Sequence, residues 1–295
     1  MFYRRKIMLA LIEVFGKELD NTDFEKLLFL FCKKYNQNFY DFFPYKFGCF
    51  SYVSYQDKRI LTKLGFLDNV EKFKLSSRTN FLNEIKSQDK KNLISFAKKM
   101  KQIKGKNLVR NIYTEFPYYA SRSEIIKEVF TEKELDEIID KASNYKKQNE
   151  TTLFTLGYEG LTIDAYLNKL IKNNIRLVID VRKNPRSMKF DFNQNKLKKY
   201  LISVDIDYLH LPELGIEPDL RKNLHSISDY EKLLEFYKRT LLIKNEKSLI
   251  LIFENLKKYN RISLLCFEKQ FKICHRSKIA ENLEKRNNIK VKHIN

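Results

Sequence analysis

The first half of the chain repeats apolar residues at helical spacing. This pattern predicts one helix from about Tyr3, a second that begins with a capping box at 22–25, and a third over 51–64. The aromatic stretch 39–50 contains a proline and a glycine, so we expect an irregular, packed connection there. The periodicity therefore predicts a mainly α-helical N-terminal domain.

A short hairpin is expected at 68–75, after the third helix. Three helices followed by a small ribbon form the outline of a winged helix-turn-helix. The next segment, Lys86 to Arg110, holds nine basic residues and one acidic residue, Asp89, and its apolar positions predict one basic amphipathic helix. Its lysines either follow the phosphate backbone of DNA or RNA, or form a face that contacts only water.

From residue 152 the pattern changes to alternating strands and helices. A long connection covers 211–228 and another apolar run covers 249–256. Strands are predicted at 152–156, 177–181, 206–210, 262–267 and 289–294, and helices at 162–171, 193–202, 230–243 and 275–284. This alternation is typical of an α/β fold with a mostly parallel sheet flanked by helices. We therefore expect a helical domain at 1–148, a linker at 145–151 and an α/β domain at 152–295.

Charged, aromatic and thiol side chains follow four of the predicted strands. In a parallel sheet, ligands bind beyond the carboxyl ends of the strands, so these side chains are expected to share one site. They are Tyr158 and Glu159 after the first strand, Asp180, Arg182 and Arg186 at and after the end of the second, His210 at the end of the third, and Cys266, Glu268, Cys274, His275 and Arg276 at and after the end of the fourth.

Three of these residues suit an anion. Arg182, Arg186 and Arg276, if they are grouped at the sheet edge, form a pocket for a phosphate or a carboxylate. The start of the last helix adds the partial positive charge of its free amide groups. The expected ligand is an anionic small molecule or a nucleotide.

The acids and the histidines suit proton transfer. Asp180, Glu159 or Glu268 can act as a general base, and His275 or His210 as a general acid. A carboxylate beside guanidinium groups is also a common structural pairing, and that alternative stays open for Asp180.

Cys266 and Cys274 allow three interpretations. Together with Glu268 and His275 they offer sulfur, nitrogen and oxygen ligands to zinc or iron, although the spacing differs from the usual pairing of two cysteines. Alternatively, Cys274 is a nucleophile whose thiolate is favoured by a helix N-terminus. In the third interpretation both cysteines only shape the pocket. Tyr158 either stacks on a base or anchors its turn.

Composition narrows the classes of partner and of activity. The formal net charge is +20, which favours polyanionic partners, although the abundance of Lys, Asn, Ile, Phe and Tyr also matches an AT-rich genome. Four cysteines are too few for a disulfide framework, which indicates a reducing compartment such as the cytoplasm. No apolar run is long enough to span a bilayer, so we expect no membrane partner. The phosphate loop of nucleotide triphosphatases, the dinucleotide turn and the zinc helix of metalloproteases are all missing from the sequence.

Four strings of residues resemble the signature blocks of a known family. TLGYEG, VIDVRKNPRS, YLHLPELG and LLCFEKQFKICHRS are similar, in the same order, to blocks of the domain of unknown function 488 family, over about 152–295. The resemblance implies an α/β domain that groups these blocks, and it implies no particular reaction. In the first half, KLLFLF and YKFGCFS are similar to strings of Panacea-type antitoxin domains.

Together these observations predict an enzyme that binds a phosphate-bearing substrate. The expected reaction is bond cleavage or group transfer on a nucleotide or a nucleic-acid component. Two alternatives remain: a ligand sensor whose N-terminal domain binds DNA, and an antitoxin-like module that binds a protein partner.

Overall fold

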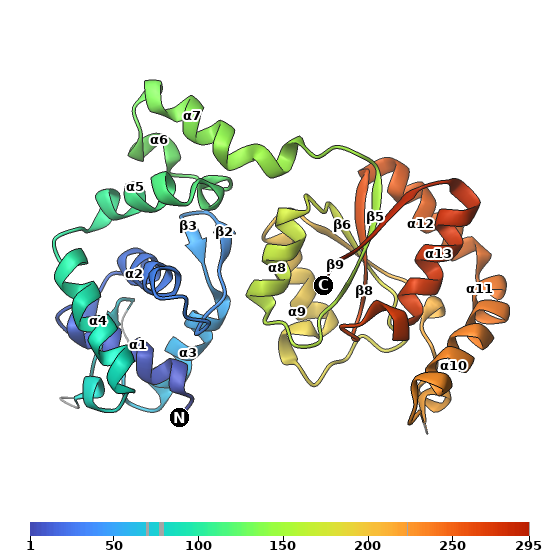
Figure 1. The fold of residues 1–295 in the computed structure, drawn as a ribbon, viewed down its shortest axis with the longest axis horizontal. Coiled ribbons are helices and arrows are strands. Elements are labelled where there is room, and N and C mark those ends of the chain that lie inside the picture. Colours follow the sequence, from blue (N-terminus) through green and yellow to red (C-terminus); the bar gives the residue numbers. More distant parts are fainter. Residues whose placement is uncertain (69–70, 77–79, 223, 295) are drawn as a thin grey trace. The chain divides into compact units, whose positions relative to one another are not determined.

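The structure is a computed structural model that describes residues 1–68, 71–76, 80–222 and 224–294. The chain divides into two compact units, Met1–Asn144 and Tyr145–Asn295 (Figure 1). The boundary lies beside the predicted linker at 145–151. Each unit is considered separately below.

The N-terminal unit consists of helices and two short antiparallel ribbons. Its helices are α1 (Tyr3–Val14), α2 (Asn21–Lys34), α3 (Tyr52–Lys63), α4 (Ser87–Met100), α5 (Gly105–Glu115), α6 (Ile126–Val129) and α7 (Glu132–Ser143). The ribbons pair β1 (Glu18–Leu19) with β4 (Phe73–Lys74) and β2 (Phe43–Tyr45) with β3 (Gly48–Phe50). Aromatic rings fill much of the core, and Phe24 of α2 stacks on Phe73 with ring centroids 3.6 Å apart.

Four local predictions for this unit need correction. The stretch 39–50 contains the β2–β3 hairpin, and Gly48 supplies the positive φ of 97° that its turn requires. The predicted capping box at 22–25 is wrong, because α2 begins at Asn21, with Asp20 as its N-cap and no hydrogen bond from a capping side chain. The predicted hairpin at 68–75 lies partly outside the described residues; in the described part, Leu67 forms an antiparallel bridge to Leu75, and β4 also pairs with β1. The single basic helix predicted over 86–110 is wrong, because the chain leaves the helical conformation at 101–104 and restarts as α5 at Gly105.

The C-terminal unit is built on five parallel strands in the order β7-β6-β8-β5-β9. They are β5 (Thr152–Gly157), β6 (Leu177–Asp180), β7 (Asp207–His210), β8 (Arg261–Cys266) and β9 (Lys290–Ile294). Every residue of β5, β6 and β8 is buried, as expected for apolar strands covered on both faces. The predicted α/β fold with a parallel sheet is confirmed.

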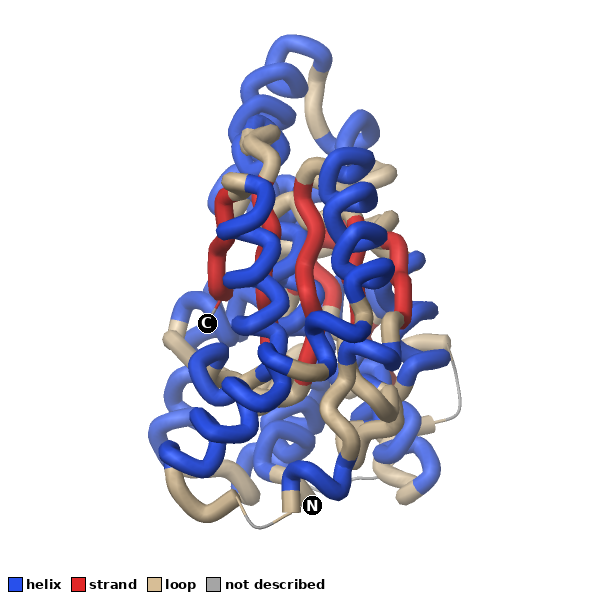
Figure 2. Tube along the Cα trace, turned by 90° about the vertical axis from the view of Figure 1, so that its right-hand side faces the viewer, coloured by secondary structure: helices blue, strands red, loops and turns tan. Residues whose placement is uncertain are grey.

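Helices cover both faces of this sheet (Figures 1 and 2). Figure 1 shows α8 (Ile163–Lys172) and α9 (Gln194–Ile202) on one side, and α12 (Glu246–Tyr259) and α13 (His275–Asn287) on the other. The apolar run 249–256 lies in α12, whose buried side chains join those of the strands in one core cluster. The remaining helices of this unit are α10 (Ile227–Arg239) and α11 (Leu241–Lys244).

Short 3₁₀ turns connect several of these elements. They lie at Phe81–Asn83, Pro117–Ala120, Asn144–Lys147, Phe190–Phe192, Pro212–Leu214, Pro218–Arg221 and Phe271–Ile273. The last three follow β7 and β8 and lie in the connections 211–226 and 267–274.

The connections after β5 and β8 lead to opposite faces of the sheet, because β5 is followed by α8 and β8 is followed by α13. These strands are neighbours in the sheet, so their carboxyl ends form the kind of crevice in which α/β proteins bind ligands.

Candidate functional site

The carboxyl ends of β5 and β8 are in backbone contact. A Cβ atom at Gly157 would lie 1.8 Å from the carbonyl oxygen of Glu268, so only glycine fits this approach. Beyond the strands the pairing continues, since the amide of Glu159 donates to the carbonyl of Phe267 over 2.9 Å. This contact joins two of the predicted loops into one wall.

Asp180 and Arg182 form a buried pair beside this wall. The two Asp180 oxygens accept hydrogen bonds from the Arg182 guanidinium at 2.8 and 2.6 Å, and Oδ2 accepts another from the Tyr208 hydroxyl at 2.7 Å. Asp180 is fully buried. With both oxygens occupied by donors, the carboxylate suits a structural role better than that of a general base.

Tyr158 is held by the same guanidinium. Nη1 of Arg182 donates to the Tyr158 hydroxyl over 2.9 Å, and the tyrosine ring stacks on Phe192 with centroids 4.2 Å apart. The tyrosine is only 2 % exposed. Its contacts favour the expected role as an anchor of the turn over stacking on a base.

Arg276, Glu159 and His210 hold the backbone of the loops. Arg276 is fully buried and donates to the carbonyls of Glu268 and Lys269 over 2.6 and 3.1 Å. The exposed Glu159 accepts from the amide of Lys269 over 2.8 Å, and Nε2 of His210 lies 2.9 Å from the carbonyl of Arg182. Arg276 therefore does not join Arg182 and Arg186 in an anion pocket: its guanidinium is engaged with carbonyl groups.

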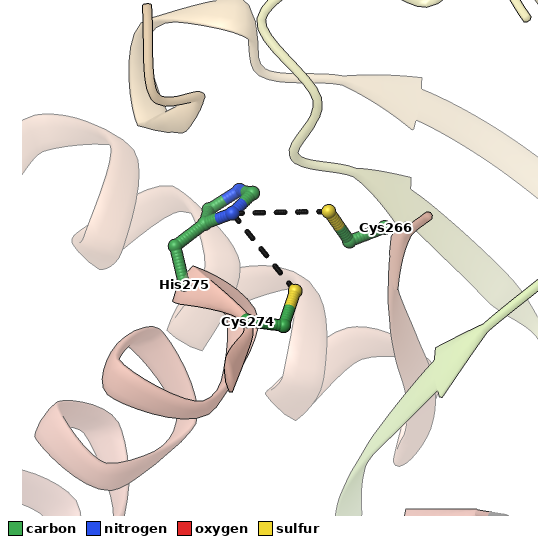
Figure 3. Close-up of side chains that lie close together, drawn as sticks. All are labelled: Cys266, Cys274 and His275. Carbon is green, nitrogen blue, oxygen red and sulfur yellow. Dashed lines mark hydrogen bonds between the residues drawn. The ribbon is translucent and has the colours of Figure 1, made fainter. Parts of the chain in front are cut away.

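Cys266, Cys274 and His275 form a compact buried group (Figure 3). Nδ1 of His275 lies 3.7 Å from the sulfur of Cys266 and 3.9 Å from that of Cys274. Nε2 of the same ring lies 2.8 Å from the carbonyl oxygen of Val181. A carbonyl only accepts hydrogen bonds, so Nε2 carries a hydrogen; in the neutral form of the ring, Nδ1 is then the acceptor nitrogen, close to the two sulfurs.

Arg221 and Glu268 flank this group. Arg221 donates to a Glu268 oxygen, and its Nη2 lies 3.1 Å from Nδ1 of His275. The second Glu268 oxygen accepts from the thiol of Cys266 over 2.9 Å. Glu268 is 8 % exposed, so its charge lies in a region of low dielectric where Arg221 is the compensating cation.

Burial and neighbouring charges act against each other on these pKa values. Burial raises the pKa of Cys266, but the hydrogen bond from Cys274 and the charge of His275 outweigh it and lower the value to about 6. Burial and Cys266 both raise the pKa of Cys274. Burial also raises the pKa of Glu268, but Arg221 outweighs it and the value falls to about 2. For His275 burial lowers the pKa, yet the attraction of Cys266 produces a net rise. The pKa directions of the two thiols therefore differ, lowered for Cys266 and raised for Cys274.

A pocket of about 350 Å³ opens beside the group. Five of its lining side chains are cationic and none is a carboxylate. The lining consists of Tyr158, Arg182, Lys183, Asn184, Arg186, Ser187, Met188, Lys189, Ile216, Pro218, Arg221, Cys266 and Phe267. It thus includes four predicted site residues, Tyr158, Arg182, Arg186 and Cys266. A larger hollow of about 590 Å³, lined by residues of α10 and α13, has mixed charges and none of the predicted site residues.

Sequence reasoning missed Arg221, Lys189 and Phe267. Arg221 lies in the long connection 211–228, and 47 residues separate it from Glu268, so no local pattern indicated their ion pair. In the structure Arg221 ends the short turn Pro218–Arg221, which begins with a proline.

Comparison with known families gives one match. Residues 162–283 match the family model described as domain of unknown function DUF488. The C-terminal unit carries a DUF488 domain. The predicted resemblance is confirmed for this range, which contains Asp180, Arg221 and the Cys266–Cys274–His275 group, whereas Tyr158 and Glu159 precede it.

The other comparisons add no relatives to the DUF488 domain. No curated protein and no solved structure matches the chain significantly. The winged-helix and antitoxin resemblances of the N-terminal unit are not confirmed. Among the helices that the structure describes, none is both long and apolar enough to cross a bilayer.

Proposed function

We propose that the DUF488 domain is an enzyme that binds a phosphate-bearing substrate and cleaves or transfers a group on it. The observation that carries this proposal is the cationic pocket at the ends of β5 and β8, whose wall includes Cys266 of the buried Cys266–Cys274–His275 group. Positive charge binds the substrate, and the buried group next to it supplies the reacting atoms.

Arg186 is the side chain best placed to bind phosphate. It is exposed on the pocket lining, and in the described part of the chain its guanidinium has no hydrogen-bond or ion-pair partner. Arg182, by contrast, donates its hydrogen bonds to Asp180, Tyr158 and the carbonyl of Phe192. Lys183 pairs with Glu217 at the exposed rim, so its charge is largely neutralised there.

The apolar part of the lining suits the base of a nucleotide. Phe267 and Met188 line the same pocket and are 43 % and 104 % exposed. Exposed aromatic and thioether surfaces beside cations are typical of sites that hold a base and its phosphate together. The proposed substrate is therefore a nucleotide or a nucleotide unit of a nucleic acid. The proposed compartment is the reducing cytoplasm, where both cysteines stay out of disulfides.

Calorimetric titration of the full chain with AMP and with adenosine tests the proposal. Arg186→Gln should weaken AMP binding by about 10- to 100-fold, the cost of one charge-assisted hydrogen bond, and leave adenosine binding unchanged. Arg239→Gln, at an exposed arginine of α10, is the matched control. Equal AMP affinity in Arg186→Gln and Arg239→Gln, or no AMP binding by the full chain, would contradict the proposal.

A second candidate function is nucleic-acid binding by the N-terminal unit. Seven lysines between 86 and 106 are exposed along α4 and the start of α5, namely Lys86, Lys91, Lys98, Lys99, Lys101, Lys104 and Lys106. The full chain should then bind duplex DNA or RNA with an affinity that falls steeply with salt. An affinity insensitive to salt would favour the antitoxin-like alternative, in which this unit binds a protein.

A further inference from the structure

The donor atoms of Cys266, Cys274 and His275 are spaced like the ligands of a tetrahedral zinc ion. With Zn–S bonds of about 2.3 Å and Zn–N bonds of about 2.0–2.1 Å, tetrahedral ligands lie about 3.6 Å apart for sulfur and nitrogen. The observed distances from Nδ1 of His275 to the two sulfurs are 3.7 and 3.9 Å. All three donor atoms lie within 4.8 Å of one another, so small movements of the side chains would bring them onto one ion.

The orientation of His275 matches that of a metal ligand. Metal-binding imidazoles usually donate their second N–H to a carbonyl or a carboxylate, which fixes the ring and its tautomer. Here Nε2 lies 2.8 Å from the carbonyl of Val181, at the end of β6, so Nδ1 is left as the donor. His275 and both cysteines are at most 2 % exposed, so the site is already desolvated before an ion enters.

The surroundings already accommodate a cation. The guanidinium of Arg221 lies against Nδ1 of His275 and is paired with Glu268. A divalent ion that takes this place would find the Glu268 carboxylate 2.9 Å from the sulfur of Cys266, and Arg221 can keep its contact with Glu268. Three protein ligands leave one position for water or substrate, the pattern of catalytic rather than structural zinc sites.

We propose that Cys266, Cys274 and His275 bind one zinc ion, with its fourth position on the side of Glu268 and Arg221. Soft thiolates and an imidazole are the donor set that favours zinc over magnesium or calcium. The inference rests on these three side chains alone. It holds whether or not the pocket beside them binds a nucleotide.

The full chain, stripped of metal and then titrated with Zn²⁺ or Co²⁺, tests the proposal. We expect one ion per chain, and a cobalt spectrum with the visible bands of tetrahedral coordination and a thiolate-to-metal charge-transfer band. Cys274→Ala should weaken zinc binding by more than the about 10- to 100-fold that follows the loss of an outer-sphere partner. Cys32→Ala, at a buried cysteine of the N-terminal unit, is the matched control and should bind like the unmodified chain.

The outcomes separate this inference from the proposed function. Less than stoichiometric metal, or a cobalt spectrum without thiolate charge transfer, overturns the zinc site even if AMP binds. Stoichiometric zinc without AMP binding supports the zinc site and overturns the nucleotide proposal. If Cys274→Ala fails to fold, the cobalt spectrum of the unmodified chain still decides, because it reports sulfur ligands directly.

Discussion

Each unit buries two cysteines, and the two pairs differ completely in their surroundings. Cys32 and Cys49 are free thiols in the N-terminal unit, where burial raises the pKa of each to about 12. Cys266 and Cys274 are equally buried but lie around an imidazole, beside Glu268 and a cationic pocket. Burial alone therefore does not distinguish a core cysteine from a reactive or metal-binding one; the polar neighbours do.

The buried charges of the two units differ in the same way. In the N-terminal unit, Lys26 is enclosed by Glu25 and the carbonyl of Cys49, and Asp57 is held by two arginines and a tyrosine. Lys26 is fully buried, and Arg4 is the partly exposed member of the Asp57 network. In the C-terminal unit the ion pair of Arg221 and Glu268 reaches the pocket lining through Arg221. The C-terminal network thus has one member, Arg221, on the lining of a pocket.

Alkylation of the reduced, metal-free full chain should show the largest contrast. With a pKa of about 12, Cys32 and Cys49 should react about a thousandfold more slowly at pH 8 than an ordinary thiol. Cys266 lines the pocket and should be modified first. Peptide mapping after iodoacetamide treatment measures the rates, and zinc should protect Cys266. Modification of Cys32 or Cys49 before Cys266 would contradict the expected difference between the two pairs of cysteines.

Removing the carboxylate charge should cost more in the C-terminal unit. Asp180→Asn leaves Arg182, which is 6 % exposed, without its counter-ion, and should lower the free energy of unfolding by about 3–5 kcal/mol. Asp57→Asn should cost about 1–3 kcal/mol, because its two arginines, Arg4 at 34 % and Arg5 at 12 % exposure, both keep some contact with solvent. Hydrogen exchange with mass spectrometry assigns each loss to one unit.

The control for this pair is Asp219→Asn. Asp219 forms an exposed pair with Lys222, so this change should stay within about 0.5 kcal/mol. An Asp57→Asn variant less stable than Asp180→Asn would reverse the expected order.

A small pH effect should come from His293 in β9. Burial, and then the charge of Arg276, lowers the pKa of its imidazole, which stacks on Phe271 at 3.7 Å. Its folded pKa lies below its unfolded pKa, so its contribution to stability is present above about pH 6.5 and is lost as the pH falls. His293→Gln should therefore lose less stability than the unmodified chain between pH 7 and pH 5. Equal losses in thermal unfolding would contradict this.

The sequence predicted the C-terminal fold because its strands and helices carry strong, separate periodicities. It also placed Cys266, Cys274 and His275 in one site, since all three follow a single strand. What it could not predict is how donors and acceptors are distributed. Whether Arg276 faces an anion or carbonyl groups, and whether Asp180 is free or held by Arg182, depends on side chains brought together by the folded chain.

In the N-terminal half, local signals were weaker. The break between α4 and α5 falls in a run of lysines that continues the helical pattern, and only Gly105, with a φ of 54°, marks it. Likewise β4 pairs with β1, which lies more than fifty residues earlier in the chain, and no pattern of neighbouring residues predicts that partner.

The glycine at the end of β5 has a consequence for any chain built on the same plan. Even a methyl group at position 157 would displace the Glu268 carbonyl, and with it the hydrogen bond that Arg276 makes there. The sheet could still assemble, because the substitution lies at the tip of the strand. In a chain with this architecture, a glycine at this position is therefore required if the backbone of Glu268 is to stay in place beside the two thiols.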